Sequence, residues 1–444
     1  MAKKKIVILG AGLAGLSTAW HLKQAGINAT VLEKENAVGG LCRSKEVDGF
    51  IFDYDGHLLH FQNSYTLGLV KKLLKGNLVR HERSAWINSF GIFSNYPFQA
   101  NLHALPKPVA NECLWGFIHA TNSRASSNQR NFLKWIHTTF GQGIAKHFMI
   151  PYNKKFWTVP LDQMVCPWTD KFIPQFDLAE VVNGFFQKGK NQFGYNAFFW
   201  YPKKKGINQL PLAFEKQIGE VSKNCCVSEI DFKKKQITVT GKGKQGYDIL
   251  ILTIPLPELM KIVKPLPNKV MGAFKKLRWN SVFNLNLGVE GECHDGKHWV
   301  YFPHQETVIF RAGFFHNFSN DITPAGKSSL YAEVAYSKNK PLNRQAIVNK
   351  ILVGLHKVGV LNKKNRVLVQ DINDIKYGYP IYDQYYSQAT KEIRQFLSSH
   401  NVITCGRYGS WQYMSMEDAM LDGKRVAENC INNNINTSKK SNKK

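Results

Sequence analysis

The chain contains 444 residues, of which 43% are hydrophobic and 12% aromatic, and its formal net charge is +27 at pH 7. This composition excludes a disordered or fibrous protein and provides enough apolar surface for two or three folding units. No apolar run approaches the roughly 18 residues that a transmembrane helix needs. The lysine-rich start passes directly into a strand pattern and lacks the features of a secretory signal, so we expect a cytoplasmic protein without a membrane span.

The eight cysteines are scattered, with no C-x-x-C pair and no His/Cys spacing that suits a metal. We therefore predict reduced thiols and no metal site. The excess of 59 Lys+Arg over 32 Asp+Glu has two interpretations. A phosphate-rich partner would fit it, but the lysines are dispersed, so a generally lysine-rich composition fits as well. The polar end NTSKKSNKK indicates a disordered basic tail over 433–444.

The first expected elements form a βαβ unit. The apolar run KIVIL precedes the glycine pattern of Gly10, Gly12 and Gly15, and the helix pattern LAGLSTAWHLKQAG follows. The next strand pattern, NATVLEK, contains Glu33. The glycines permit a tight turn and close approach to a pyrophosphate, and the acid accepts hydrogen bonds from a ribose that lacks a 2′-phosphate. This order of elements predicts dinucleotide binding.

The segment after Glu33 distinguishes FAD from NAD. AVGGLCRS, residues 37–44, resembles the second glycine pair of FAD-binding oxidoreductases of the amine oxidase and mutase superfamily. In that superfamily the segment wraps the flavin side of the cofactor; a simple glycine turn is the alternative. The cofactor-binding residues expected in this part of the chain are Gly10, Gly12, Leu13, Ala14, Gly15, Glu33, Lys34, Gly39, Gly40, Leu41 and Arg43.

Two later segments are expected to return to the cofactor. YDILILTIPLPELMKIV (247–263) supplies an apolar strand, a proline-rich turn and a helix. The segment 405–428 combines aromatic residues with a helix start, which would face the isoalloxazine carbonyls and stabilise an anionic reduced flavin. The further cofactor positions are Gly56, His57, Gly406, Arg407 and Met416.

The middle of the chain has a different character. Residues 104–190 are rich in helix formers and aromatic residues, whereas 276–395 contain alternating patterns such as SVFNLNLGVEG and SLYAEVAYS. Alternation predicts antiparallel strands. We therefore predict an α/β protein with a discontinuous Rossmann-like FAD-binding domain (1–80, 191–275 and 396–432), a mainly helical insertion (104–190) and an antiparallel β-sheet substrate domain (81–103 and 276–395).

Seven motifs resemble those of UDP-galactopyranose mutases, especially the eukaryotic-type branch. They occur in the order of that family and extend the resemblance from residue 8 to residue 428. The motifs are DGHLLHF (55–61), YPFQANL (96–102), HFMIPYNKKFWTVPLDQMVCPW (147–168), FGYNAFFWYPKKKGINQLP (193–211), WVYFPHQETVIFRAGFFHNFS (299–319), YGYP (377–380) and GRYGSWQY (406–413).

The resemblance implies an isomerase that interconverts pyranose and furanose forms of a UDP-sugar, most of all UDP-galactose, without net redox change. N5 of reduced FAD would attack the anomeric carbon to form an N5–sugar adduct, while UDP stays close for the return step. NADPH or NADH would be the reductant, and galactofuranose units would serve cell-surface polysaccharide biosynthesis. A homo-oligomer and peripheral contact with anionic surfaces are further implications; specific nucleic-acid binding is not expected.

The resemblance also assigns roles to single residues. Arg311 would pair with the diphosphate through bidentate hydrogen bonds, and Tyr379 and Tyr413 would donate to the same phosphates. Arg407 would lie between sugar and flavin. Together with His57 in the flavin-edge loop, these are the expected catalytic residues. The further substrate-binding positions are Gln99, Asn153, Trp157, Asn196, Trp299 and Tyr301.

Each of these residues also has a purely structural interpretation. Arg311 could be a salt-bridged strand residue, and Gln99 and Asn196 could cap turns. Trp157 and Trp411 could be core aromatics, and for Trp411 we prefer core packing. The backbone of His57 could matter more than its side chain.

The chain departs from the family pattern at two points. Phe172 occupies the position of a second, mobile arginine, with Lys171 beside it as a possible point charge. The usual glycine-rich run is reduced to PKKKGINQLP. These departures leave the identity of the sugar open.

Two other functions remain compatible with the sequence. The FAD segments alone would equally fit an FAD-dependent oxidoreductase of the amine oxidase or protoporphyrinogen oxidase type. A non-catalytic protein that binds flavin or a polyanion is the third alternative. The arginines and tyrosines suited to a diphosphate favour the mutase.

Overall fold

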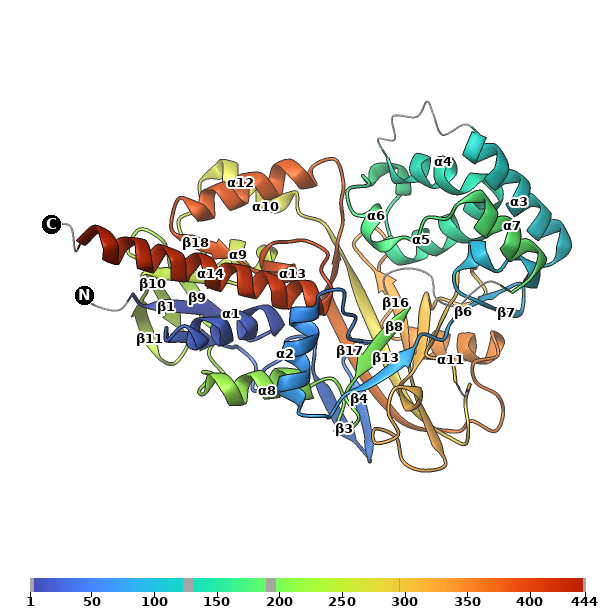
Figure 1. The fold of residues 1–444 in the computed structure, drawn as a ribbon, viewed down its shortest axis with the longest axis horizontal. Coiled ribbons are helices and arrows are strands. Elements are labelled where there is room, and N and C mark those ends of the chain that lie inside the picture. The colour runs from blue at the N-terminus through green and yellow to red at the C-terminus, as the bar shows by residue number, and fades with distance from the viewer. Residues whose placement is uncertain (1–3, 123–130, 189–196, 295, 442–444) are drawn as a thin grey trace.

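The computed structural model describes residues 4–122, 131–188, 197–294 and 296–441, with side chains up to residue 432. Two parts lie side by side (Figure 1). One part holds both ends of the described chain, and the other contains a large sheet with a helical layer above it.

A four-stranded parallel sheet forms the centre of the first part. Its strands, in spatial order, are β18 (Val402–Thr404), β12 (Ile249–Leu252), β1 (Ile6–Leu9) and β2 (Ala29–Leu32). All four residues of β1 are apolar and buried, which is typical of a parallel sheet covered on both faces. Segments from the beginning, middle and end of the chain therefore meet in one sheet.

Helices pack around this sheet. The helix α1 (Leu13–Gln24) packs against α14 (Met416–Ser441) and α8 (Gln209–Ile218). The other helices in this part are α2 (Ser64–Leu74), α9 (Leu256–Ile262), α10 (Asn268–Lys275), α12 (Tyr386–Ser398) and α13 (Gly406–Gly409). Because α12 contacts α10 and β18, the return to this part begins before residue 396.

Three smaller sheets accompany the two larger sheets. A three-stranded antiparallel sheet has the order β11 (Gly243–Gly246), β10 (Gln236–Val239) and β9 (Val227–Asp231). Two antiparallel pairs are formed by β3 (Ser44–Val47) with β4 (Phe50–Asp53) and by β5 (Val79–Glu82) with β8 (Phe198–Tyr201).

The second part is built on a seven-stranded sheet. In spatial order the strands are β17 (Val367–Pro380), β13 (Trp279–Glu290), β16 (Lys327–Tyr336), β15 (Arg311–Phe314), β14 (Trp299–Tyr301), β6 (Ala85–Ser89) and β7 (Ile92–Asn95). Every neighbouring pair is antiparallel except β14 and β6, which are parallel. The helix α11 (Ile347–Lys357) contributes buried residues to the core beside this sheet.

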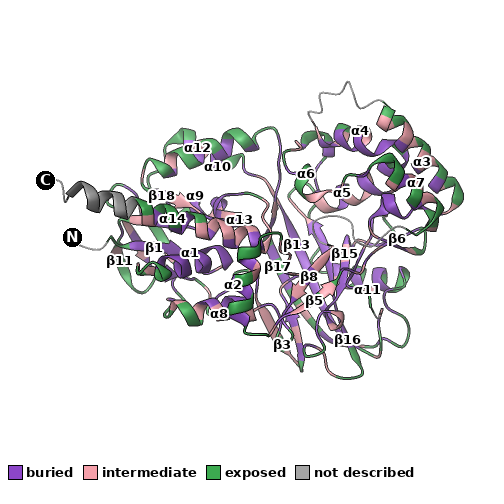
Figure 2. Cartoon of the chain, in the orientation of Figure 1, coloured by how far each residue is buried: buried purple, intermediate pink, exposed green. Residues whose placement is uncertain are grey.

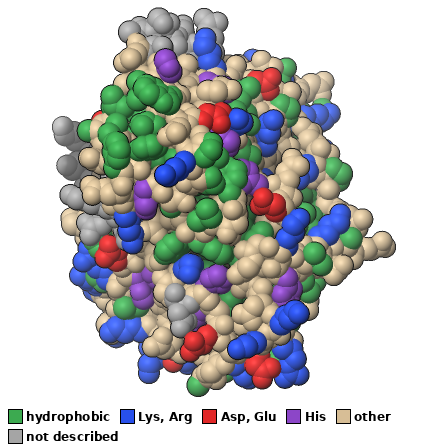
Figure 3. Space-filling model, turned by 90° about the vertical axis from the view of Figure 1, so that its right-hand side faces the viewer, with side chains coloured by type: hydrophobic (Ala, Val, Ile, Leu, Met, Phe, Trp, Pro, Cys, Tyr) green, Lys and Arg blue, Asp and Glu red, His purple; other side chains and the backbone are tan. Residues whose placement is uncertain are grey.

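A helical layer covers one end of the large sheet. It contains α3 (Lys107–Asn122), α4 (Phe132–Ile144), a π-helix (Ala145–Met149), α5 (Ile150–Trp157), α6 (Thr169–Phe172) and α7 (Leu178–Phe186). Hydrophobic side chains gather on the upper part of the face in Figure 3, with lysines and arginines more frequent below. Trp115 and Phe186 in this layer are 62% and 76% exposed.

The helix α14 extends into the predicted basic tail. The tail was predicted over 433–444, α14 ends at Ser441, and residues 442–444 lie outside the described residues. No glycine or proline follows Gly423, so no backbone feature interrupts the helix.

Burial follows the two sheets. Figure 2 shows buried residues along the parallel sheet, α1 and the strands of the large sheet, and exposed residues on the outer sides of α3 and α12. Within the described residues, no helix is both long and apolar enough to cross a membrane. The predicted fold class, an α/β protein with helices and several sheets, is confirmed.

Candidate active site

A cavity of about 1060 Å³ lies between the two parts of the molecule. The glycine-rich turn after β1, the end of β2 and the start of α14 line one half. Strands β14, β15 and β17 and helices α5 and α6 line the other half. The cavity therefore connects the predicted dinucleotide site with the predicted substrate site.

The glycine-rich turn is closely packed. Gly10 has a φ of 100°, and a Cβ there would lie 2.4 Å from the Thr253 hydroxyl oxygen. A Cβ at Gly15 would lie 2.1 Å from the Gly10 carbonyl oxygen, so the helix can approach the turn only with glycine at this position. Gly15 supports the turn from behind, because it does not line the cavity itself.

The turn leaves the start of α1 open to a ligand. Gly12 is the N-cap of α1 and has no side chain that could accept hydrogen bonds from the first backbone N–H groups of the helix. The buried carboxylate of Glu33 lines the same half of the cavity and accepts from the backbone N–H of Ala11 at 2.8 Å. A pyrophosphate at a helix start and a ribose beside an acid are the two recognition features of a bound dinucleotide. These residues fit FAD.

The second glycine segment joins this site through the backbone. The Gly39 N–H donates to the Ala11 carbonyl at 2.8 Å, and Gly39 forms an isolated parallel bridge with Gly12. Arg43 donates through Nε to the Gly40 carbonyl at 2.8 Å. The predicted positions Gly39, Gly40, Leu41 and Arg43 therefore line the cavity. Lys34, Gly56 and His57 line it as well.

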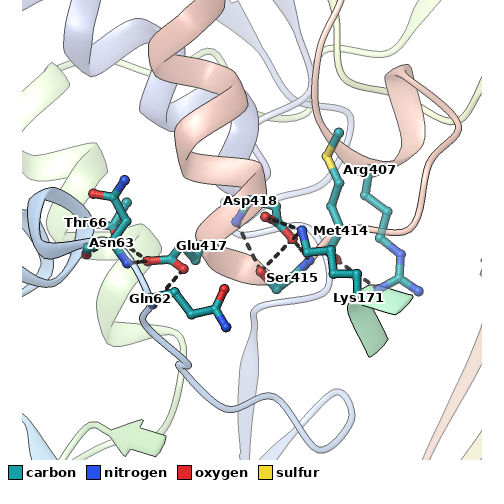
Figure 4. Close-up of polar contacts among 9 residues, drawn as sticks. All are labelled: Gln62, Asn63, Thr66, Lys171, Arg407, Met414, Ser415, Glu417 and Asp418. Atoms are coloured by element: carbon teal, nitrogen blue, oxygen red, sulfur yellow. Dashed lines mark hydrogen bonds and ion pairs between the residues drawn. The ribbon is translucent and has the colours of Figure 1, made fainter. Parts of the chain in front are cut away.

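Two acidic side chains fix the start of α14 (Figure 4). Glu417 accepts from the backbone N–H groups of Gln62 and Asn63 at 2.9 and 3.0 Å, and from the Thr66 hydroxyl. Asp418 accepts from the Ser415 N–H at 2.9 Å. These contacts hold the helix start and the cavity-lining residue Met416 against the loop that follows His57.

Arg407 is a partly buried cation without a carboxylate partner among the described residues. Its NH2 donates to the Gly378 carbonyl at 2.6 Å, and its buried Nε has no hydrogen-bond partner there. The guanidinium carbon lies 4.5 Å from the centre of the Tyr379 ring and 4.9 Å from that of Tyr413. This side chain therefore has both charge and donors available for an anion.

Burial raises the pKa of Tyr379 and of Tyr413, so both phenols are protonated donors at neutral pH. Burial also lowers the pKa of His57, which is therefore a neutral imidazole. The positive charge beside Tyr379 and Tyr413 therefore comes from arginine and not from His57.

Arg311 has a different environment. Its Nε donates to the fully buried carboxylate of Glu333, and its NH2 donates to the other oxygen of the same carboxylate at 2.9 Å. Asp55 lies 3.7 Å from the same NH2. The charge of Arg311 is therefore balanced within the protein, although the side chain lines the cavity.

The other predicted substrate positions separate into groups. Trp299 and Tyr301 line the cavity, and the buried Trp299 Nε1 has no hydrogen-bond partner among the described residues. Asn153 and Trp157 line it too and are hydrogen-bonded to each other at 3.1 Å. Gln99 is buried away from the cavity wall and donates to the Pro174 carbonyl at 3.3 Å.

The remaining predicted position, Asn196, lies outside the described residues. The predicted core packing of Trp411 is confirmed, because its exposed fraction is 0%.

Sequence reasoning missed an aromatic wall that begins on the π-helix Ala145–Met149 and continues on α5. The rings of Phe148, Tyr152 and Phe156 follow one another at centroid distances of 5.7 and 6.2 Å, and all three residues line the cavity. The i, i+4 spacing in HFMIPYNKKFW was the available signal.

The helix α5 is anchored by a lysine. The buried Lys155 donates to the carbonyls of Phe302 and Ile309 at 2.7 and 2.9 Å, which anchors α5 to the loop before β15.

On α6 the chain departs from the mutase pattern, because Phe172 occupies the position of the second arginine, and this departure has a structural consequence. The Phe172 ring lies 4.1 Å from the Tyr413 ring and lines the cavity, but Lys171 does not line it. The Lys171 ammonium donates to Asp418 at 2.8 Å instead, as Figure 4 shows. Lys171 thus connects the helical layer with the start of α14.

Solved structures share this architecture. The crystal structure of a reduced UDP-galactopyranose mutase matches with a TM-score of 0.93 and 27% identity, covering 97% of this chain and 94% of that one. A structure described as a protoporphyrinogen oxidase from Exiguobacterium sp. 255-15 matches with a TM-score of 0.74 and 17% identity, covering 97% and 99%. The second similarity concerns the fold alone.

The sequence relatives carry the names of oxidases and desaturases. An L-amino-acid oxidase from Crotalus adamanteus is 24% identical over 302 residues, which are 63% of this chain and 56% of that protein. A 4,4'-diaponeurosporene oxygenase from Staphylococcus haemolyticus is 41% identical over 59 residues, 13% of this chain and 12% of that protein. The chain thus spans less than two thirds of either relative.

The family match covers much more of the chain. Residues 13–431 match the family described as flavin-containing amine oxidoreductases. Together with the parallel sheet and the glycine-rich turn, this match establishes that the chain belongs to the flavin-containing amine oxidoreductase family.

Proposed function

We propose that this protein is an FAD-dependent nucleotide-sugar mutase that interconverts the pyranose and furanose forms of a UDP-sugar, UDP-galactose being the favoured substrate, without net redox change. The proposal rests mainly on the cavity, which joins a dinucleotide site to the partly buried Arg407 guanidinium, which lacks a carboxylate partner among the described residues. The similarity to a reduced UDP-galactopyranose mutase supports it.

The chain's own residues bind and orient the nucleotide sugar. Arg407 attracts the diphosphate by charge, and the protonated hydroxyls of Tyr379 and Tyr413 donate hydrogen bonds to it. Arg311 adds donors whose charge Glu333 has already balanced. The aromatic wall of Phe148, Tyr152 and Phe156 excludes water and offers a stacking surface for uracil.

Reduced FAD, when bound, would supply the nucleophilic nitrogen for the anomeric carbon, after reduction by NADPH or NADH. The residues that would hold it are the glycine-rich turn, Glu33 and the 37–44 segment on the dinucleotide side, with Gly56, Gly406 and Met416 at the flavin end. The positive end of the α14 dipole faces that end of the cavity and favours an anionic flavin.

An FAD-dependent oxidoreductase of the amine oxidase or protoporphyrinogen oxidase type is the second candidate. The family and the names of the sequence relatives favour it. An amine or tetrapyrrole does not require two arginines and two tyrosines in the substrate half of the cavity, so the composition of the cavity favours the mutase.

The following experiment tests the two candidates. Purified yellow protein is reduced anaerobically with dithionite and incubated with UDP-galactopyranose or UDP-galactofuranose, and chromatography follows their interconversion. Oxidised protein serves as the control. Conversion only by the reduced protein supports the mutase. Absence of both conversion and UDP binding would refute it and favour the oxidase.

The cellular setting is also a proposal. All eight cysteines are free, which fits a reducing compartment such as the cytoplasm. The exposed Trp115 and Phe186 would suit a contact between copies of the chain through the helical layer. The excess of lysines would suit peripheral contact with anionic surfaces, and the product would supply furanose units for cell-surface glycans.

A further inference from the structure

Two tyrosines outside the cavity hold the short segment 411–413. The Tyr382 hydroxyl accepts from the Tyr413 backbone N–H at 2.7 Å, and the Tyr386 hydroxyl donates to the Trp411 carbonyl at 2.6 Å. The rings of Tyr382 and Tyr386 lie 4.4 Å apart. Both side chains are buried, and neither lines the cavity, whereas Tyr413 does. The two tyrosines therefore contact the site only through the backbone of this segment.

The held segment begins with a strained residue. Trp411 has a φ of 51°, in the left-handed region that bulky side chains rarely adopt. Its side chain is fully buried, and its ring lies 6.0 Å from the rings of both Trp279 and Tyr377. A backbone in this region persists only where its surroundings fix it. The packing of the ring and the hydrogen bond from Tyr386 provide that support.

The position of the Tyr413 ring depends on this backbone. The ring lies 4.1 Å from the Phe172 ring, 5.3 Å from the Tyr379 ring and 4.9 Å from the guanidinium carbon of Arg407. Ring contacts tolerate a range of geometries, whereas a hydrogen bond of 2.7 Å fixes the backbone from which the ring projects. The direction of the Tyr413 hydroxyl is therefore set largely by Tyr382.

Tyr382 also connects this segment with the helical layer. Its carbonyl accepts from the Val165 N–H at 2.8 Å. Val165 precedes α6, the helix that carries Phe172. Tyr382 thus bonds to the segment of Tyr413 through its hydroxyl and to the layer of Phe172 through its carbonyl, and the rings of these two residues meet at the cavity.

We propose that Tyr382 and Tyr386 are positioning residues that hold the Tyr413 hydroxyl toward the diphosphate of the nucleotide sugar. The role toward the diphosphate rests on the proposed function, whereas the hold on the segment 411–413 does not. Neither tyrosine touches the ligand, so both act through Tyr413.

Calorimetric titration of the flavin-bound protein with UDP tests the role toward the diphosphate. Tyr382→Phe and Tyr386→Phe each remove one hydroxyl and should each weaken UDP binding by roughly two- to tenfold, the usual contribution of one hydrogen bond. In the background of Tyr413→Phe, which lacks the hydroxyl to be positioned, neither change should cause a further loss. Tyr385→Phe is the matched control, because Tyr385 is 48% exposed, and it should bind UDP as the wild type does.

Two results of this titration would overturn the proposal. Unchanged affinity in Tyr382→Phe and Tyr386→Phe would show that their hydroxyls do not position Tyr413. Equal losses with and without the Tyr413 hydroxyl would show that they act on the structure in general and not through Tyr413.

Hydrogen exchange of the flavin-bound protein tests the hold on the segment without any ligand. Mass spectrometry of overlapping peptides should show the Tyr413 amide exchanging roughly fivefold faster in Tyr382→Phe, and at the wild-type rate in Tyr385→Phe. An unchanged rate in Tyr382→Phe would overturn the hold. If the wild type binds no UDP, the proposed function and the role toward the diphosphate fail together, and the exchange rate still decides whether Tyr382 holds the segment.

Discussion

Arg311 and Arg407 line the same cavity in opposite electrostatic states. Arg311, on β15, donates to a buried carboxylate and has a second carboxyl 3.7 Å away. Arg407, on α13, donates to the backbone carbonyls of Gly378 and Met414 and is surrounded by tyrosine rings. A partly buried guanidinium that lacks a counter-ion is available to bind one, whereas a neutralised guanidinium mainly organises its surroundings. Under the proposed function, this difference favours Arg407 over Arg311 as the main ligand of the diphosphate.

The largest expected effect is on stability at Arg311. Removing the carboxylate in Glu333→Ala should lower the free energy of unfolding by about 3 kcal/mol, since breaking one side of a buried pair leaves the other side poorly compensated. Denaturant unfolding of the flavin-bound protein would measure it. Glu290→Ala is the matched control, because Glu290 pairs with Arg366 at an exposed site. An equal loss in both variants would contradict the structural role of Arg311.

The next effect is on ligand affinity at Arg407. A charge-assisted hydrogen bond contributes about 1.5–3 kcal/mol, so Arg407→Ala should weaken UDP binding by roughly 10- to 100-fold. Arg311→Ala should lose less affinity and more stability. Calorimetric titration with UDP would give the affinities, with the exposed Arg366→Ala as the control. The reverse order of the two affinities would show that Arg311 is the main diphosphate ligand, as the resemblance to the mutases implies.

The sequence was sufficient to predict the fold, but it predicted only part of the difference between Arg311 and Arg407. The glycines, the apolar strand runs and the alternating patterns predicted the parallel sheet and the large sheet, because each is a local signal. The parallel pairing of β14 with β6 was not predictable, since the two strands lie far apart in the chain. The same holds for the contact of Arg311 with Glu333 and Asp55, which three separate segments create.

The composition of the cavity illustrates the same limit. Arg407, Tyr379 and Tyr413 were predicted from motifs, and the structure brings them together. Gln99 belongs to an equally good motif but is buried against Pro174. A motif therefore places a residue near a site, whereas its orientation depends on tertiary packing.

A pH titration of stability would distinguish the two arginine environments more finely. The folded state raises the pKa of Glu333, so the folded chain retains a proton on this group up to a higher pH than the unfolded chain does. Stability from this group is therefore present at low pH and declines as pH rises from about 4.5, by up to about 1.4 kcal/mol per pH unit. As pH rises, the free energy of unfolding of the wild type should fall relative to that of Glu333→Gln. The difference between the wild type and Arg407→Ala should stay constant over the same pH range. A pH-independent difference between the wild type and Glu333→Gln would contradict the raised pKa of Glu333.

The smallest expected effect concerns Lys171, the residue beside the missing second arginine. Its ammonium is about half exposed and pairs with Asp418, so Lys171→Ala should lower the free energy of unfolding by at most about 1 kcal/mol. UDP affinity should stay close to that of the wild type, because Lys171 does not line the cavity. Lys261→Ala, which removes another exposed ion pair, is the control. A tenfold loss of UDP affinity only in Lys171→Ala would mean that the lysine leaves Asp418 when the nucleotide binds. Arg407 would then share the diphosphate with a cation from the helical layer.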